Sequence, residues 1–294
     1  MMNDFWIILV GALVAGSCSV LGCFLIVRKM TLIGDAISHS VLPGIVLAFL
    51  ITGTRDSVPM LIGAAALGLL TVFLIQLFQS SGVQSDAAIG IVFTSLFATG
   101  IVLVSLYTQQ IDFDLEHVLY GEIAYTPWNT MTIGGIEAGP KAVWIVGSCF
   151  ILNLILIFLF FKQFKLVSFD PSLAAAMGIP VLFFHYLLMS LISLTTVASF
   201  DSVGSILVVG MLIIPAATAY LLSDRLSRMI LVSIGVGVLS SVIGYYSATI
   251  LDASISGCMV GSAAILFGLA FLFSPGNGLV SLLLKRRKSK ESHA

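Results

Sequence analysis

The run Phe150–Phe161 reads FILNLILIFLFF, and the run Ile230–Val242 is almost as apolar. Both are continuous, whereas the strands of a membrane β-barrel would alternate between polar and apolar residues. A helix needs roughly 20 apolar residues to cross the hydrocarbon core of a bilayer. Runs of this kind fill most of the chain, so the sequence predicts an all-α, polytopic transmembrane helical bundle.

The composition supports a protein that lies in lipid. Of the 294 residues, 59% are hydrophobic and 9% are charged, and the mean hydropathy is +1.14. Soluble domains carry about 25% charged residues, so the bilayer is the expected surrounding medium. The net charge is −1 and the chain has no basic domain, which argues against a nucleic-acid partner.

Nine spans are expected, or eight if the short second one is only a partial span. Residues 1–284 would form a single permease-like transmembrane domain, and residues 285–294 a basic tail at the inner surface. The first run follows Asp4 and no basic residue, so it is expected to be a retained span rather than a cleaved signal. The predicted spans are Phe5–Val27, Gly34–Ile51, Val58–Phe78, Ala87–Tyr107, Ala142–Phe161, Val181–Ala198, Val203–Leu222, Met229–Ile250 and Gly257–Phe273.

Basic residues predict the orientation, because cytoplasmic loops are enriched in Lys and Arg. With nine spans and the N-terminus outside, 11 of the 13 basic residues fall on the cytoplasmic side, and only Arg55 and Lys141 fall outside. The C-terminus is then cytoplasmic. The outer segments are acidic, which either concentrates cations or is ordinary solvated charge.

The most informative stretch is Gly34–Gly44, GDAISHSVLPG. Asp35 and His39 stand one helical turn apart and share a face, so both can reach one divalent cation. Pro43 has no N–H for the carbonyl of His39, which frees that oxygen for another partner. Ionisable residues at membrane depth usually face a pathway. The alternative is that Asp35 caps the helix while a neighbouring helix satisfies His39.

Other positions carry weaker signals. Pro215 lies inside an apolar run and predicts a kink, either at a broken transporter helix or at a plain packing site. His185 is expected to be satisfied between helices. All four cysteines lie in or beside apolar runs and are expected to be buried thiols rather than metal ligands.

Two cytoplasmic segments could contact a partner, or could be simple connections. One runs from Phe169 to Pro180 and includes Asp170, and the other is the polar turn Ser223–Arg228 with Asp224, Arg225 and Arg228. The sequence has no phosphate-binding loop and no hydrolase or protease motif. The chain is therefore expected not to be an enzyme.

In order along the chain, several of these stretches resemble the permease subunits of bacterial ABC importers for manganese, zinc and iron, the ABC-3 family. Leu119–Ile123 resembles a family loop, although Tyr120 and Glu122 replace the usual Phe and Asp. The four main stretches are Gly34–Gly44, Asp86–Ile91, Phe169–Pro180 and Val203–Ala219.

The resemblance implies a fold similar to vitamin B12 and siderophore permeases. It implies a second permease copy (identical or a close paralogue), cytoplasmic ATP-binding subunits, and an extracellular metal-binding lipoprotein or periplasmic protein. It places the metal site on Asp35 and His39, a pathway or gate near Pro43, Glu122 and Pro215, and the chain in a bacterial cell (inner) membrane. The Ser223–Met229 turn is expected to couple to the ATPase, with Phe169–Pro180 second.

The expected function is ATP-driven uptake of a divalent metal that is transported and not permanently bound. Oxygen and nitrogen ligands suit Mn²⁺ or Zn²⁺, and the carboxylate favours Mn²⁺ first. The alternative is a secondary transporter driven by an ion gradient, which would need no ATPase partner.

Overall fold

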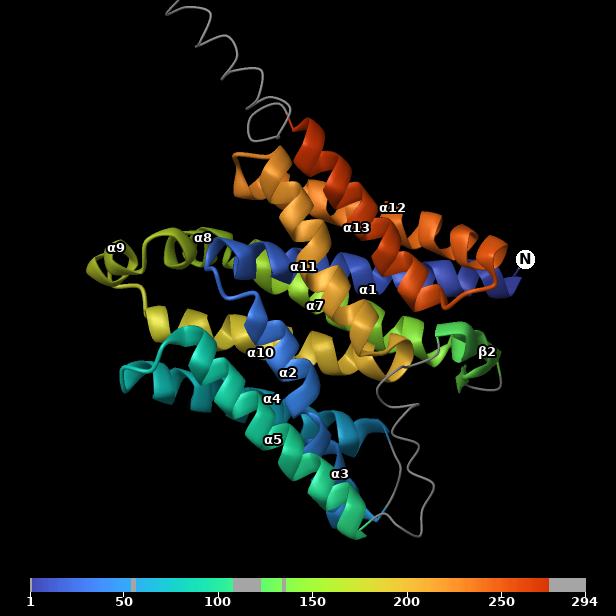
Figure 1. Ribbon diagram of the computed structural model, residues 1–294, viewed down its shortest axis with the longest axis horizontal. Helices are drawn as coiled ribbons and strands as arrows, with labels where there is room; N and C mark the ends of the chain where they lie inside the picture. The colour runs from blue at the N-terminus through green and yellow to red at the C-terminus, as the bar shows by residue number, and fades with distance from the viewer. Residues whose placement is uncertain (1, 54–56, 108–122, 134–135, 275–294) are drawn as a thin grey trace, which may run out of the picture.

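The computed structural model describes residues 2–53, 57–107, 123–133 and 136–274. Within these ranges, nine helical segments are long and apolar enough to cross a membrane, as the sequence predicted. Residues 285–294 and Glu122 lie outside the described residues. The long helices lie side by side or cross at moderate angles (Figure 1).

The helices and strands follow one another along the chain with short connections. The first half contains α1 (Met2–Val27), α2 (Leu32–Ser40), α3 (Leu42–Thr52), α4 (Ser57–Ser80), α5 (Ser85–Tyr107), the 3₁₀ helix η1 (Ile123–Trp128) and the strands β1 (Thr130–Ile133) and β2 (Ile136–Pro140). The second half contains α7 (Lys141–Leu159), α8 (Phe161–Phe169), α9 (Pro171–Ala176), α10 (Val181–Val203), α11 (Ser205–Leu222), α12 (Leu226–Leu251) and α13 (Ile255–Phe273).

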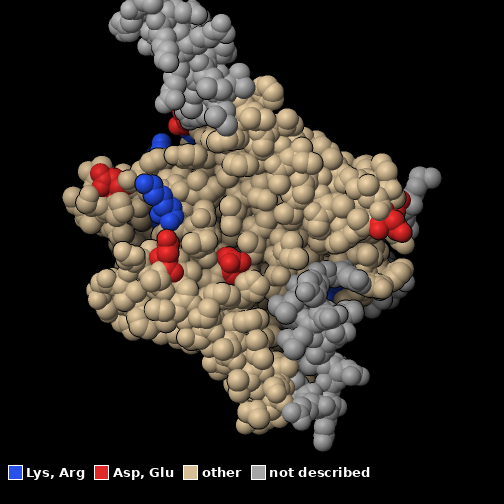
Figure 2. Space-filling model, in the orientation of Figure 1, with Lys and Arg blue, Asp and Glu red and all other residues tan. Residues whose placement is uncertain are grey.

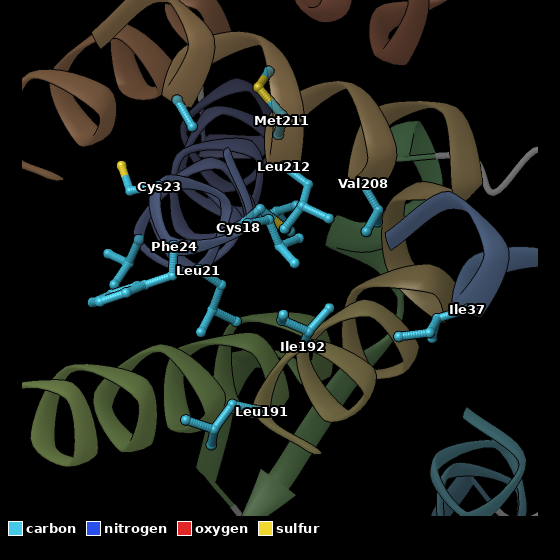
Figure 3. Packing of buried hydrophobic residues seen from close by; sticks show 14 of the residues in the cluster. Cys18, Leu21, Cys23, Phe24, Ile37, Leu191, Ile192, Val208, Met211 and Leu212 are labelled. Atoms are coloured by element: carbon cyan, nitrogen blue, oxygen red, sulfur yellow. The ribbon is translucent and has the colours of Figure 1, made fainter. Parts of the chain in front are cut away.

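Helix α1 is the centre of the bundle. Its span is 78% buried, whereas the spans of α4, α5 and α7 are each 28% buried. It packs against α7, α10, α11 and α12. Figure 3 shows Cys18 and Leu21 of α1 gathered with Ile192 of α10 and Leu212 of α11. The outer helices thus leave apolar faces for lipid or for another chain.

The second predicted span is made of two helices. α2 ends at Ser40, Val41 forms a turn, and α3 begins at Leu42 with Pro43 in its first turn. Pro43 cannot donate to the carbonyl of His39, which is the physical reason for the interruption. Together the two helices still give one candidate span, Leu32–Thr52.

Three features go beyond the sequence expectations. An antiparallel hairpin, β1–β2, lies between the predicted spans Ala87–Tyr107 and Ala142–Phe161. α11 is one uninterrupted helix through Pro215. α10 and α11 are joined by Gly204 alone, whose φ of 79° favours glycine.

The cysteines agree with the sequence interpretation. All four are free thiols. Cys18, Cys23 and Cys149 are buried, and Cys258 is partly buried. They act as small apolar side chains in the packing of the spans.

Candidate metal site

Asp35 and His39 face each other along α2. The His39 Nε2 atom lies 3.6 Å from Asp35 Oδ1, and the side chains are 31% and 45% exposed. This distance is too long for a hydrogen bond. It is less than twice a metal–ligand distance of about 2.1 Å, so one ion can contact both atoms. The pair can therefore bind a divalent cation.

The alternative reading of Asp35 as a helix cap is wrong. The N-cap of α2 is Thr31, and Asp35 lies inside the first turns of the helix, four residues further on. Its carboxylate still benefits from the positive end of the helix dipole. The side chain is thus left available to a ligand outside the helix backbone.

Two aromatic rings of α5 pack against the imidazole of His39. The ring centroids of Phe93 and Phe97 lie 5.5 and 5.8 Å from the centroid of His39, in tilted and edge-on arrangements. The two phenyl rings also stack on each other at 6.1 Å. This packing restricts the rotamers of His39. The sequence contained the neighbouring stretch Asp86–Ile91 but gave no sign of this contact.

Hydroxyl groups fix α2 against the rest of the bundle. The Ser40 and Thr71 hydroxyls are 2.7 Å apart and buried, which joins α2 to α4. Ser38 donates to the carbonyl of Gly34 at 3.0 Å within α2. The Ser40–Thr71 bond thus helps to fix α2 against α4, whereas the Ser38 bond is local to α2.

The two candidate gate prolines lie in close packing next to the site helices. A β-carbon on Gly100 of α5 would lie 2.8 Å from Cδ of Pro43. Pro215 is buried in α11. Leu212, one turn before it, lies so close to Gly34 that a β-carbon there would be 2.2 Å from Cδ2 of Leu212. α11 therefore touches the residue that precedes Asp35.

Within the described ranges, the candidate site has two side chains that could bind a metal ion, Asp35 and His39. Among the described residues, no group of three His, Cys, Asp or Glu side chains is arranged to hold a metal ion. Divalent ions normally take at least four ligands. Further ligands would come from backbone carbonyls, water, another chain or residues outside the described ranges.

The four residues proposed for ATPase coupling lie outside the candidate metal site and are exposed. Asp170 is the N-cap of α9 and accepts hydrogen bonds from the Ser172 hydroxyl at 2.6 Å and the Leu173 N–H at 2.9 Å. These bonds lower the pKa of Asp170 below 3.8. Asp224, Arg225 and Arg228 are exposed at the turn between α11 and α12.

His185 does not follow the sequence expectation in full. Its Nδ1 lies 3.5 Å from Nη1 of Arg28. Its Nε2 is buried and has no hydrogen-bond partner among the described residues. The sequence interpretation missed Arg28 as its neighbour, because the two residues are 157 positions apart.

Charge is sparse on the face shown in Figure 2, where a few Lys, Arg, Asp and Glu side chains interrupt a broad uncharged surface. Such a surface suits lipid or a partner membrane protein.

The chain is similar to known proteins over nearly its whole length. Residues 2–274 match the model of the ABC 3 transport family. The manganese transport system membrane protein MntD of Bacillus subtilis is 54% identical over 294 residues, which is 100% of both chains. The zinc transport system membrane protein TroD of Treponema pallidum is 38% identical over 97% of this chain and 77% of its own.

A solved structure is similar as well. The structure of PsaBC from Streptococcus pneumoniae in complex with Fab has a TM-score of 0.77 and 38% sequence identity. The match covers 94% of this chain and 93% of that one.

Proposed function

The chain belongs to the ABC 3 transport family, and on that premise we propose that it is the membrane-spanning permease subunit of an importer for a divalent metal ion. The observation that carries this proposal is the pair Asp35 and His39, which face each other at 3.6 Å beside an interrupted span. Interrupted helices at membrane depth commonly form the binding sites of transporters.

Manganese is the first choice of metal and zinc the second. The site offers a carboxylate oxygen and an imidazole nitrogen, which both ions accept. The cysteine nearest in sequence, Cys23, is buried in the main core around α1. A site with no thiolate and with a carboxylate favours the harder ion, Mn²⁺. The name of the Bacillus subtilis relative supports the same order.

A second permease copy completes the pathway. The side chains of Asp35 and His39 are 45% and 31% exposed, and they provide only two ligands. The same pair from a second copy, identical or a close paralogue, would raise the number to four. Their exposure fits a site that is closed by pairing and not by the fold of one chain.

Energy comes from other subunits. The sequence has no phosphate-binding loop of its own, so ATP would bind cytoplasmic partner subunits. Family membership favours this arrangement over a secondary transporter driven by an ion gradient. An extracellular metal-binding protein would deliver the ion to the outer side.

The ATPase contact has two candidate segments. Exposed apolar side chains at a protein surface indicate a partner. α9 and its flanks expose Phe169 at 61%, Leu173 at 48% and Met177 at 65%. The Asp224–Arg228 turn exposes mainly charged and polar groups. These exposed apolar side chains reverse the order expected from the sequence. We therefore propose α9 as the first candidate, with Asp170 fixing its start, and the turn as the second.

The orientation follows the charge asymmetry of the loops. The N-terminus would lie outside and the C-terminus in the cytoplasm of a bacterial cell. α9, the α11–α12 turn and the end of α1 then share the cytoplasmic side. This places both candidate ATPase contacts where ATP is available.

The test is metal uptake by cells that carry the complete importer. Asp35→Ala and His39→Ala should each abolish most uptake of Mn²⁺ at limiting concentration, while the protein level in the membrane stays normal. Asp86→Ala, which removes an exposed carboxylate at the start of α5, is the matched control. Normal uptake and metal preference in both site variants would refute the assignment.

A further inference from the structure

A pocket of about 550 Å³ lies where the ends of several spans meet. Its lining residues belong to the end of α1, the last turns of α4, the end of α8 and the first turns of α10. The candidate spans of α1 and α4 end at Val27 and Ser80, and that of α10 begins at Val181. The pocket therefore lies at the depth where lipid headgroups meet the protein, and in Figure 1 these helix ends lie on the left, with α8 and α9.

The polar wall of the pocket is built around Arg28. Its Nε donates to the Ser168 hydroxyl at 2.9 Å, and its Nη1 lies 3.5 Å from Nδ1 of His185. A guanidinium has only donors, so Nδ1 of His185 is the acceptor and Nε2 carries the ring proton. Two further donors, Arg28 Nη2 and His185 Nε2, lie just under the surface of this wall.

Both of these donors lack an acceptor. Arg28 Nη2 and His185 Nε2 are buried without a hydrogen-bond partner in the part of the chain that the structure describes. Burial lowers the pKa of Arg28 to about 10, so the group stays charged at neutral pH. Buried donors, and above all buried charges, normally have a partner. The two donors therefore point to an acceptor that the described part of the chain does not provide.

The residues around the pocket fit an anion. Lys29 adds a second cation, and Gln76 and Gln79 add amides. No Asp or Glu is among the described lining residues. Asp170, next to the lining residue Pro171, accepts bonds from Ser172 and Leu173 through its Oδ1 atom and does not itself line the pocket.

The rest of the lining is apolar. Val27, Met30, Val181 and Leu182 line the same pocket, and Leu182 is 63% exposed. A ligand that matches both walls carries a negative headgroup and an apolar tail. Basic pockets between membrane helices bind such lipid headgroups.

We propose that this pocket binds the phosphate of an acidic phospholipid headgroup, with Arg28 and His185 as donors and Lys29 at its rim. The two donor nitrogens lie under the pocket surface, so the guanidinium rotates toward the headgroup when it binds. The bound lipid joins α1, α8 and α10 next to the point where the chain passes from α8 into α9. This site is separate from Asp35 and His39 and does not depend on the transported ion.

The test is lipid retention by the full-length chain purified in detergent with phosphatidylglycerol or phosphatidylcholine and analysed by native mass spectrometry. The unchanged chain should retain phosphatidylglycerol in preference to phosphatidylcholine. Arg28→Gln should reduce that retention about fivefold, since one basic group at the headgroup contributes roughly this factor. Lys165→Gln removes an exposed cation of α8 that does not line the pocket, and should change nothing.

Lys29→Gln keeps the test decisive if Arg28→Gln fails to fold, because Lys29 is exposed. It should reduce retention by a smaller factor. The proposal is overturned if Lys29→Gln retains as much phosphatidylglycerol as the unchanged chain. Where Arg28→Gln folds, it must also retain as much for the proposal to be overturned.

Two other sources of an acceptor give distinct results. In one case, inorganic phosphate binds in an Arg28-dependent way and the chain shows no preference between the two lipids. The ligand of the pocket is then a free anion and not a lipid. In the other case, the chain alone retains phosphatidylglycerol but loses it on assembly with its ATPase partner. The acceptor of the two donors is then a carboxylate of that partner. Either result overturns the lipid assignment.

Discussion

Gly44 of α3 and Gly63 of α4 lie backbone to backbone. A β-carbon on Gly44 would be 2.5 Å from the carbonyl oxygen of Gly63, and one on Gly63 would be 2.6 Å from that of Gly44. Small residues allow such close approach between membrane helices. The contact holds the second half of the interrupted span against α4, just beyond Pro43.

Gly44→Ala and Gly63→Ala should each separate α3 from α4 and lower the stability of the protein by about 1–3 kcal/mol, the usual cost of overpacking. The measurement is thermal unfolding in detergent. Gly90→Ala is the control, since a β-carbon there meets nothing within 4 Å. It should be neutral or slightly stabilising because alanine favours the helix. Equal effects at all three positions would contradict the close contact.

Phe97→Leu should loosen the imidazole of His39 without removing a ligand. The Phe97 ring lies 5.8 Å from that of His39, and groups that orient a metal ligand typically change affinity by roughly 10-fold or more. The expected result is a higher half-saturating Mn²⁺ concentration for uptake, with the protein level unchanged. Phe73→Leu, at an exposed position on α4, should leave it unchanged. An unaltered half-saturation in Phe97→Leu would show that the ring does not position His39.

Asn153→Leu should destabilise the junction of α1, α7 and α10. The buried amide donates to the Ser17 hydroxyl at 3.0 Å and to the Thr195 hydroxyl at 2.7 Å. Hydrogen bonds between membrane helices contribute about 1 kcal/mol, so a small loss in thermal stability is expected. Ser148→Ala removes bonds that are local to α7, with the carbonyl of Ile145 and with Cys149, and serves as the control. If both variants unfold at the same temperature, the amide is not a link between helices.

Leu173→Asp should separate ATP hydrolysis from transport if α9 is the ATPase contact. An exposed apolar side chain in an interface loses its contact when it becomes charged. The measurement is ATP hydrolysis and Mn²⁺ uptake by the reconstituted importer. Arg225→Glu and Arg228→Glu test the other segment in the same assay. Lys162→Glu, an exposed charge reversal on α8, controls for general electrostatic effects.

The two segments give opposite outcomes. Loss of coupling in Leu173→Asp alone supports α9, and loss in the arginine variants alone moves the contact to the α11–α12 turn. Normal coupling in all of them would remove both segments from the proposed interface.

The sequence by itself determined the spans and predicted the two residues of the candidate site. Apolar runs such as Phe150–Phe161 set the membrane helices, because span length depends only on local hydropathy. The spacing of Asp35 and His39 placed them on one helical face, and Pro43 interrupted the span. These are properties of neighbours along the chain, so no tertiary information was needed.

Only the tertiary structure decided how the spans pack. The rings of Phe93 and Phe97 around His39, the Gly44–Gly63 contact and the Arg28–His185 pair all join different helices. In a soluble helix the apolar stripe marks the buried face. Lipid is as apolar as a protein interior, so a membrane helix is apolar on every side and its sequence does not reveal which face meets which partner.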